Sequence, residues 1–405
     1  MIQITKKEDC CGCEACIQRC PKQCISLKED EEGFLYPIVD KDACINCNLC
    51  EKICPVINQG KKHDPIKVLA AKNKDENIRL KSSSGGIFTL LAEKTIQTRG
   101  VVFGACFNDK WEVIHKYTEM KEGIAVFRGS KYTQSKIGES YKQAEYFLKQ
   151  GRKVLFSGTP CQIAGLKRYL RKEYDNLLTV DIICHGVPSP KVWRLYLNDI
   201  LTRKVGLNSI PSHPINKKVE IKNINFRSKS TGWKNYSFVL ALSEMTTDGK
   251  KNTVLLSSIF KDNAFMKAFL SDLILRPSCY QCPAKAGKSG SDISIADYWC
   301  IQDVVQKFDD DKGVSLVLIQ TPKGDEFFQT LKEKTEWIET GYEESKKGNG
   351  GFKEICNPHS KRKEFFYMLN SQKRIINLIE SALRQTYLQK IKSYLKLALK
   401  HIIEA

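Results

Sequence analysis

Eight cysteines near the N-terminus form two copies of one pattern, and their spacing is typical of iron–sulfur proteins. Each copy reads C-x2-C-x2-C-x3-C-P, and every member of the second copy lies 34 positions after its counterpart. The members are Cys10, Cys13, Cys16, Cys20 and Pro21, then Cys44, Cys47, Cys50, Cys54 and Pro55. Because each iron of a [4Fe–4S] cluster takes a thiolate, the two copies predict two clusters and a role in electron transfer.

The fourth cysteine of each copy is expected to serve the other cluster, as in two-cluster ferredoxins. We therefore predict one cluster on the first cysteine group, Cys10, Cys13, Cys16 and Cys54, and another on the second cysteine group, Cys44, Cys47, Cys50 and Cys20. Zinc sites are the alternative, since they also use C-x2-C, but they do not require a third cysteine or the proline. Cys11 and Cys24 lie outside the pattern and are expected to be small packing residues.

Four further cysteines lie beside turn-forming residues in the rest of the chain. This third cysteine group consists of Cys161, Cys184, Cys279 and Cys282, of which the last two form another C-x2-C. A third [4Fe–4S] cluster is one interpretation, and unrelated thiols or a redox-active pair are the others. Cys161 follows a predicted strand and starts a predicted helix, where the helix dipole is expected to favour a thiolate.

Strand and helix signals alternate after a polar linker at 59–65, and this predicts an α/β domain with an open sheet. A hairpin is expected at 24–39, between the two cysteine patterns, and a β-rich stretch around 220–242. Helices are expected at 82–96, 161–172, 192–201 and 265–275. In open α/β sheets ligands bind at the carboxyl ends of the strands, and the turns around Gly85, Thr159 and His185 are expected there.

The 405-residue chain has a net charge of +19, but residues 1–60 hold seven basic and ten acidic residues, which leaves +22 on the remainder. General solvation, an anionic cofactor and a lipid surface are all compatible with this charge. No nucleic-acid-binding motif is found, so no nucleic-acid partner is expected. Without a secretory signal or an apolar run of transmembrane length, the chain is expected to be cytoplasmic.

Several segments resemble the family of coenzyme F-420 hydrogenase/dehydrogenase beta subunits. The carriers of the resemblance are GTPCQIAGL from 158, DIICHGVPSP from 181, RPSCYQCPAK from 276 and SDISIADYW from 291, with SSSGGIFT and FRGSKYTQS resembling its N-terminal part. The likeness runs from about 67 to about 350, behind the ferredoxin-like run. After the final Trp the family pattern leads us to expect glycine, but this chain has Cys300.

The resemblance implies FAD, with electrons passing between clusters and a deazaflavin, coenzyme F-420, or an organic substrate. It names as candidate flavin contacts Ser84, Gly85, Gly86, Lys131, Gly158, Thr159 and Pro160. Lys131 would face the diphosphate or the N1/C2=O region of the flavin. His185 is a candidate proton donor to substrate, and a structural turn histidine is the alternative. Ferredoxin-fused relatives also resemble proteins of polysaccharide gene sets.

The expected architecture is an α+β ferredoxin-like domain at 1–58, an α/β flavin-binding domain at 67–358 and a helical C-terminal tail at 359–405. The tail carries apolar residues at helical spacing between Leu388 and Ile402, with lysines on its other faces. It could contact a membrane periphery or a partner, or pack on its own domain. The predicted function is an iron–sulfur flavoprotein oxidoreductase with an electron-donor or acceptor protein and a small-molecule substrate. The alternative is a non-catalytic electron-transfer subunit.

Overall fold

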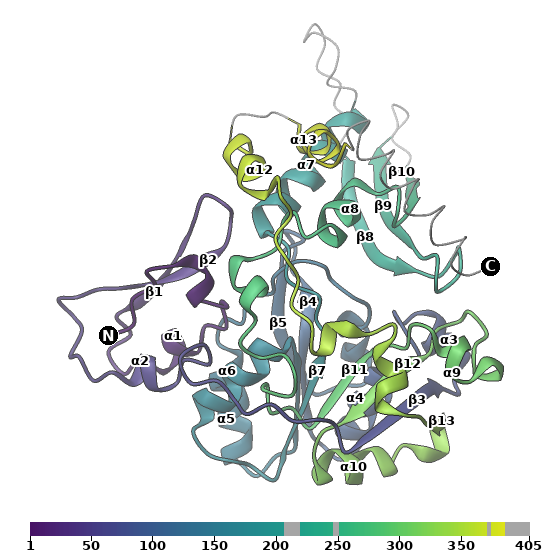
Figure 1. Cartoon of the computed structure of the whole chain (residues 1–405), viewed down its shortest axis with the longest axis horizontal. Helices are drawn as coiled ribbons and strands as arrows, with labels where there is room; N and C mark the ends of the chain where they lie inside the picture. The colour runs from purple at the N-terminus through teal and green to yellow at the C-terminus, as the bar shows by residue number, and fades with distance from the viewer. Residues whose placement is uncertain (206–218, 246–250, 371–373, 385–405) are drawn as a thin grey trace, which may run out of the picture.

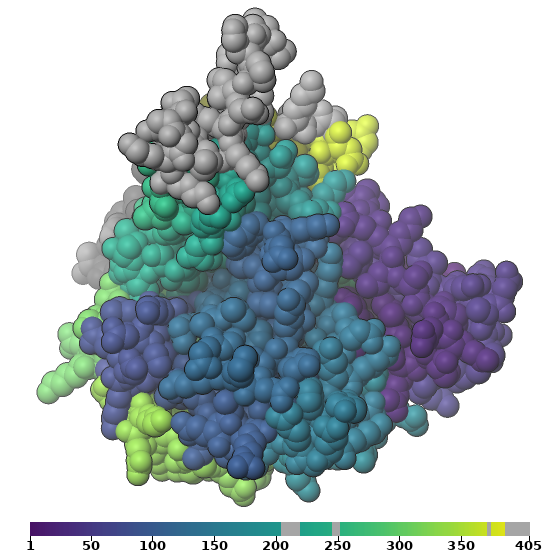
Figure 2. Space-filling view, turned by 180° about the vertical axis from the view of Figure 1, so that it is seen from behind, coloured from purple at the N-terminus to yellow at the C-terminus, as the bar shows by residue number. Residues whose placement is uncertain are grey.

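The computed structural model describes residues 1–205, 219–245, 251–370 and 374–384. The N-terminal module projects from one side of the body (Figures 1 and 2). It contains the helices α1 (Ala15–Arg19) and α2 (Leu49–Lys52) and the antiparallel hairpin β1 (Ile25–Glu29) and β2 (Leu35–Val39). The hairpin predicted between the cysteine patterns is thus present.

The body is built on an eight-stranded sheet with the order β13-β3-β12-β11-β7-β6-β4-β5. Its strands are β3 (Lys67–Asn73), β4 (Val101–Phe107), β5 (Val113–Thr118), β6 (Val154–Gly158), β7 (Leu177–Ile182), β11 (Ile293–Asp297), β12 (Ser315–Ile319) and β13 (Thr335–Glu339). Strands β4, β6, β7 and β11 are parallel, whereas β5, β12 and β13 pair antiparallel. The predicted α/β sheet is therefore a mixed sheet.

Helices cover both faces of this sheet because its central strands are apolar on both sides. Phe103 and Phe156 face a core that includes α5 (Ser140–Lys149) and α6 (Pro160–Leu170). Val102 and Leu155 face a second core, which includes α4 (Ile87–Gln97) and α10 (Pro322–Gln329). Shorter helices are α3 (Glu76–Leu80), α9 (Ile301–Val304) and α11 (Tyr342–Lys346).

A separate antiparallel sheet of β8 (Val219–Ser228), β9 (Ser237–Met245) and β10 (Lys251–Ile259) accounts for the predicted β-rich stretch. It shares a core with α7 (Pro190–Val205), α8 (Ala264–Leu270), α12 (Arg362–Met368) and α13 (Ile375–Leu383). The helix expected at 265–275 ends at Leu270, because Asp272 adopts the left-handed conformation with φ 61°. The described parts of the expected tail, 359–370 and 374–384, thus pack on the body, and Leu388 to Ile402 lie outside the described residues.

Short 3-10 helices complete the described chain: η1 (Lys7–Asp9), η2 (Glu122–Phe127), η3 (Pro277–Gln281), η4 (Gln306–Phe308), η5 (Lys332–Lys334) and η6 (Gly350–Phe352). None of the helices in the described ranges combines the length and the apolar character needed to span a bilayer.

The module is fixed to the body by side chains of α1. Gln18 Oε1 accepts hydrogen bonds from the backbone N–H groups of Tyr141, at 3.1 Å, and Lys142, at 3.3 Å, at the start of α5. These are N–H groups that a helix leaves without an internal partner, so α1 supplies a cap for α5. The expected linker also contacts the body, since His63 N donates to Ala286 O at 3.2 Å.

Candidate redox site

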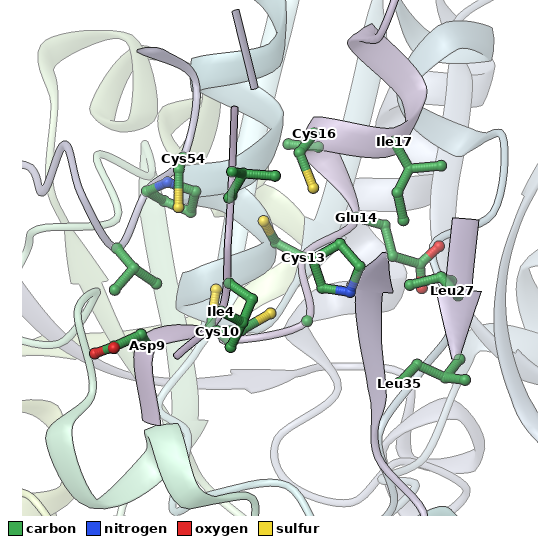
Figure 3. Close-up of a pocket in the computed structure, with 17 residues that line it drawn as sticks. Ile4, Asp9, Cys10, Cys13, Glu14, Cys16, Ile17, Leu27, Leu35 and Cys54 are labelled. Carbon is green, nitrogen blue, oxygen red and sulfur yellow. The ribbon is translucent and has the colours of Figure 1, made fainter. Parts of the chain in front are cut away.

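The first cysteine group lines a single hollow at the inner side of the module. Its sulfur atoms point toward one another (Figure 3). Those of Cys10 and Cys13 come from the loop before α1, that of Cys16 from α1 itself, and that of Cys54 from the segment after α2. Gly12 and Glu14 allow the tight loop by taking left-handed φ values of 70° and 61°. Burial raises the pKa of Cys16 and Cys54. Four unpaired thiols around one space fit the donor set of a [4Fe–4S] cluster.

The second cysteine group lines another hollow, at the outer side of the module, together with Cys24. Cys24 Sγ lies 3.4 Å from Cys20 Sγ, so this cysteine is a neighbour of the predicted ligands. Cys47 is exposed, in contrast to the buried Cys13 and Cys16 of the first group. Each hollow combines three cysteines of one copy with the fourth of the other. This is the crossed arrangement expected from the sequence, and ligation by these thiols stays a prediction.

The third cysteine group meets at the carboxyl edge of the large sheet. Cys161 lies three residues after the end of β6 and Cys184 two residues after the end of β7, while Cys279 lies in η3. The pKa of Cys184 is raised well above its ordinary value, first by burial and then by the neighbouring thiolates of the other three members. The fold thus brings together four cysteines that are far apart in sequence, and this donor set also fits a cluster.

Cys11 touches both the first and the third group. Its thiol exchanges hydrogen bonds with Cys13 and Cys161, so it fills the space between the two groups. The pKa of Cys161 is raised well above its ordinary value by the hydrogen bond with Cys11 and by burial. Both effects act against the α6 dipole, and the preference of Cys161 for the thiolate stays a prediction. Cys11 has a more specific position than the packing role expected from the sequence.

The expected flavin-contact turn at Ser84–Gly86 packs against the ends of β3 and β12. Ser84 Oγ donates to Val314 O at 2.7 Å, and Gly85 N donates to Ser315 Oγ at 3.0 Å. A side chain at Gly85 would place its Cβ 2.3 Å from Ala71 O, so the close packing of the sheet requires this glycine. Gly86 precedes α4 with φ 84°. These polar groups already have partners within the protein.

Lys131 is also engaged inside the protein. Its ammonium donates to the carbonyl oxygens of Phe127, Arg128 and Gly129 at 3.0 to 3.3 Å, and burial lowers its pKa to about 8. The neighbouring Ser130 donates from its N–H to Ser83 Oγ at 2.8 Å, so two segments expected at the flavin do meet. The contact of Lys131 with a flavin diphosphate stays a prediction.

Gly158, Thr159 and Pro160 connect β6 to α6, directly beside the third cysteine group. Thr159 is the N-cap of α6 in a capping box with Gln162, and its Oγ1 lies 3.2 Å from Cys161 Sγ. The expected flavin residues thus form two sets along the carboxyl edge. One set adjoins the third cysteine group, and the other lies at the Ser83–Ser130 contact.

Sequence reasoning did not identify Arg227, which lies beside the Ser83–Ser130 contact. Its guanidinium pairs with both oxygens of Asp297 at 2.8 and 3.0 Å and lies 3.9 Å from the centre of the Tyr236 ring. Its Nε is buried and has no hydrogen-bond partner among the described residues. Asp297 compensates the charge of Arg227, so the unused Nε donor is what makes this residue a candidate for a ligand contact. The ADYW segment, which contains Asp297, was the available signal.

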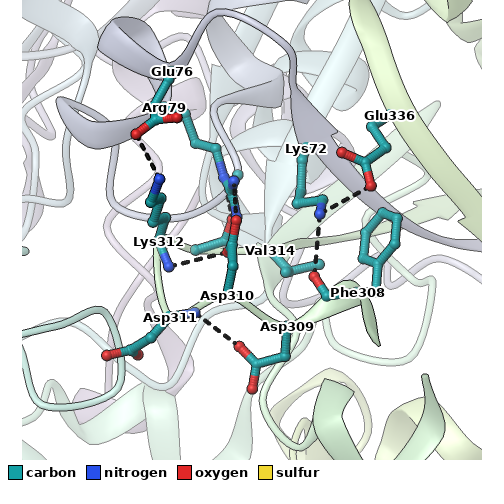
Figure 4. A network of polar contacts seen from close by, with 12 residues as sticks. Lys72, Glu76, Arg79, Phe308, Asp309, Asp310, Asp311, Lys312, Val314 and Glu336 are labelled. Atoms are coloured by element: carbon teal, nitrogen blue, oxygen red, sulfur yellow. Dashed lines mark hydrogen bonds and ion pairs between the residues drawn. The ribbon is translucent and has the colours of Figure 1, made fainter. Parts of the chain in front are cut away.

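Ion pairs connect α3 to the acidic loop at 309–311 and to the lysine that follows it (Figure 4). Arg79 of α3 forms a bidentate ion pair with Asp310, and Lys312 pairs with Glu76 at 2.7 Å. Lys229 donates to the carbonyl oxygens of Ser84 and Lys312 at 2.7 Å, and burial lowers its pKa to about 7. These contacts hold the Ser84–Gly86 turn rigid.

His185, the expected proton donor, is held by a carboxylate. Its Nε2 lies 2.7 Å from Asp272 Oδ1, and its backbone carbonyl accepts a hydrogen bond from Cys356 Sγ at 2.8 Å. Cys356 therefore makes a polar contact with the His185 backbone. The catalytic role of His185 and the structural alternative, a turn histidine, both stay predictions.

The family model for the C-terminal part of the coenzyme F420 hydrogenase/dehydrogenase beta subunit matches residues 151–345, and the 4Fe-4S dicluster domain matches residues 9–58. Residues 151–345 of the chain thus belong to the family of coenzyme F420 hydrogenase/dehydrogenase beta subunits, and a 4Fe-4S dicluster domain precedes them. The F subunit of F(420)H(2) dehydrogenase from Methanosarcina mazei is 23% identical over 391 residues, which are 89% of this chain and 96% of that protein. An uncharacterized ferredoxin of Methanocaldococcus jannaschii is 38% identical over 74 residues, 18% of this chain and 88% of the ferredoxin.

A chain of the F420-reducing [NiFe] hydrogenase complex from Methanosarcina barkeri, solved with xenon, has a TM-score of 0.42 and 19% identity, and the likeness covers 79% of this chain and 91% of that one. A TM-score this low does not establish a shared fold. The region that matches the coenzyme F420 hydrogenase/dehydrogenase family includes the third cysteine group and Arg227. The glycine expected after Trp299 is replaced by Cys300, whose φ of 62° explains why glycine suits that position.

Proposed function

We propose that the chain is an iron–sulfur flavoprotein oxidoreductase that carries electrons between its [4Fe–4S] clusters and FAD, and on to a deazaflavin or an organic substrate. The observation that carries the proposal is the order of the three cysteine groups in space. It runs from the exposed Cys47 of the second group through the first group to the third group at the carboxyl edge of the sheet. Clusters transfer single electrons, whereas a flavin, when bound, exchanges one or two.

The residues of the chain would bind the clusters and the flavin and shield them from water. The first and second cysteine groups supply thiolates, and the third supplies another four beside Gly158–Pro160. Arg227 and the Ser83–Ser130 contact would orient an anionic cofactor, and the dense sheet packing around Gly85 would exclude water. Coenzyme F-420 as acceptor is supported by the names of the relatives. The link to polysaccharide biosynthesis rests on the resemblance of the sequence alone.

A second function, that of an electron-transfer subunit without its own substrate, is favoured by the exposure of Cys47 on the outer side of the module. The Methanosarcina mazei relative is itself described as a subunit. Turnover of a small substrate by the isolated chain would decide against this function.

The test is anaerobic purification with iron, sulfide and flavin counted per chain. About eight irons indicate two clusters and about twelve indicate three, because each cubane holds four. Flavin absorbance, or binding of FAD on reconstitution, is expected as well. A preparation with full iron that neither contains nor binds flavin would reject the flavoprotein and leave the electron-transfer subunit.

A further inference from the structure

Arg276 is a fully buried arginine at the seam between the N-terminal module and the body, with 0% of its surface exposed. It lies three residues before Cys279 of the third cysteine group. Its Nε donates to Cys10 O at 2.8 Å, and its Nη2 lies 3.5 Å from Cys10 Sγ. One side chain of the body therefore contacts both the backbone and the sulfur of a first-group cysteine.

Among the described residues, no carboxylate forms an ion pair with Arg276. Of the four arginines that are buried in the described part of the chain, Arg79, Arg227 and Arg362 pair with Asp310, Asp297 and Glu32. Arg276 instead contacts carbonyl oxygens, the amide of Gln134 at 2.8 Å and the Cys10 thiol. Because an uncompensated buried charge is costly, its position makes sense beside a group that becomes anionic. The first cysteine group, as thiolates, is that group.

The loop that carries the first cysteine group packs closely against Arg276. A Cβ at Gly12 would lie 2.8 Å from Arg276 Nη1 and 2.4 Å from Gln134 Nε2, and Gln134 Nε2 also donates to Cys11 O at 3.2 Å. Cys11 in turn contacts Cys161 of the third group. Arg276 and Cys11 thus occupy the space between the first and third groups.

We propose that Arg276 is a positioning residue that raises the reduction potential of the cluster on the first cysteine group and fixes that cluster against the third group. The inference rests on the proposed function. Reduction adds one negative charge, and a fixed positive charge nearby in a medium of low dielectric stabilises the reduced form. With clusters bound to both groups, one electron would pass from the second cysteine group to the first, with no bond broken and no proton required, and Arg276 would stabilise the charge that arrives. Arg276 thereby favours electron flow inward.

The experiment is a potentiometric titration of the anaerobically purified full chain, followed by electron paramagnetic resonance. In Arg276→Gln the reduction equilibrium constant of one N-terminal cluster is expected to fall at least tenfold, about 59 mV for one electron, while that of the other is unchanged. Arg276→Lys, which keeps the charge, should lose less. Arg362→Gln is the matched control, because Arg362 also joins the module to the body, through Glu32, but contacts no cysteine.

A second variant keeps the inference testable if the Arg276→Gln protein does not fold. Gln134→Glu places a carboxylate at the atom that is 2.8 Å from Arg276 Nη1 and neutralises the arginine without removing it, so the same potential should fall. If Gln134→Glu and any folded, fully loaded Arg276→Gln protein leave both potentials unchanged, the inference is wrong. If the parent protein holds no clusters, the proposed function fails instead.

Discussion

Cys54 and Cys20 each lie in the hollow formed by the other copy of the cysteine pattern, and this exchange can be tested by counting iron. Cys54→Ser alone is expected to cost about four irons per chain, because one cubane is lost. Adding Cys16→Ser, in the same group, should cost no more. Adding Cys50→Ser, in the other group, should cost about eight in total.

The measurement is iron and sulfide per chain after anaerobic purification, with Cys24→Ser as the control for a nearby cysteine that we do not predict as a ligand. The crossed assignment is refuted if Cys54→Ser with Cys50→Ser removes only one cluster while Cys54→Ser with Cys16→Ser removes two. Uncrossed ligation gives that opposite pattern, so the two double variants separate the two assignments.

Cys300 has a strained backbone conformation at a position where the family pattern leads us to expect glycine. Its φ of 62° costs an ordinary side chain about 1 kcal/mol, whereas glycine adopts this conformation freely. We therefore expect the relief of this strain in Cys300→Gly to raise the free energy of unfolding by about 1 kcal/mol. The greater conformational entropy of glycine in the unfolded chain reduces this gain. Thermal unfolding of the loaded protein measures it.

Cys300→Ala is the matched control, since it removes the sulfur but keeps the Cβ that causes the strain. It should not raise the melting temperature. An equal gain in both variants would show that the thiol, rather than the backbone conformation, is unfavourable at this position.

At the level of elements, α6 approaches the module closely enough that its glycine has no room for a side chain. A Cβ at Gly165 would lie 2.8 Å from Cys13 Cβ and 2.9 Å from the Tyr141 hydroxyl. Gly165→Ala is therefore expected to destabilise the protein by about 1–3 kcal/mol, as overpacking of a core does, and to disturb the cluster on the first cysteine group. The resonance of that cluster and the melting temperature are the measurements.

Gly351→Ala serves as the comparison, because the nearest atom to its added Cβ is 3.4 Å away, at ordinary contact distance. This variant should keep both clusters and its melting temperature. A Gly165→Ala protein with parental resonances and stability would mean that α6 and the module can separate without cost.

The same elements show what the sequence could and could not predict. The cysteine spacing is local, so the two N-terminal groups, the hairpin between them and most central strands could be predicted. The contact of Arg276 with Cys10 joins residues 266 positions apart, and that of Arg227 with Asp297 joins residues 70 apart. Such contacts depend on the order of strands in the sheet, which periodicity does not determine. The mixed sheet and the roles of Cys11 and Arg227 were missed for this reason.

Across the whole molecule, the three cysteine groups run from an exposed end to a buried one. Cys47 of the second group is exposed, the first group lies against the body, and Cys11 connects it to the third group at the carboxyl edge of the sheet. Glu14, Gln18 and Arg19 of the module also bind the body through hydrogen bonds and an ion pair. The module is therefore part of the same folded unit as the body. Electron transfer between the cysteine groups would not require the module to bind the body first.

The C-terminal helices complete this body, and truncation tests their role. The apolar residues that they add to the core of the smaller sheet are Phe365, Phe366, Leu369, Ile375, Leu378 and Ile379. Burial of one such side chain contributes about 1.5–3 kcal/mol, so the six together contribute about 9–18 kcal/mol, which is comparable to the usual net stability of about 5–15 kcal/mol. The Arg362–Glu32 ion pair is lost as well. A chain that stops after residue 358 is expected to be insoluble or unfolded.

A chain that stops after residue 384 is the control, because it keeps every contact described above. It should retain its clusters and its melting temperature, measured by iron content and by thermal unfolding. Flotation of both the parent and this shorter chain with anionic phospholipid vesicles then examines the basic segment separately. Loss of vesicle binding with the fold intact would support a peripheral membrane contact through that segment, and equal binding would assign any lipid affinity to the body. A folded, loaded chain ending at 358 would instead show that α12 and α13 are not needed for the fold of the body.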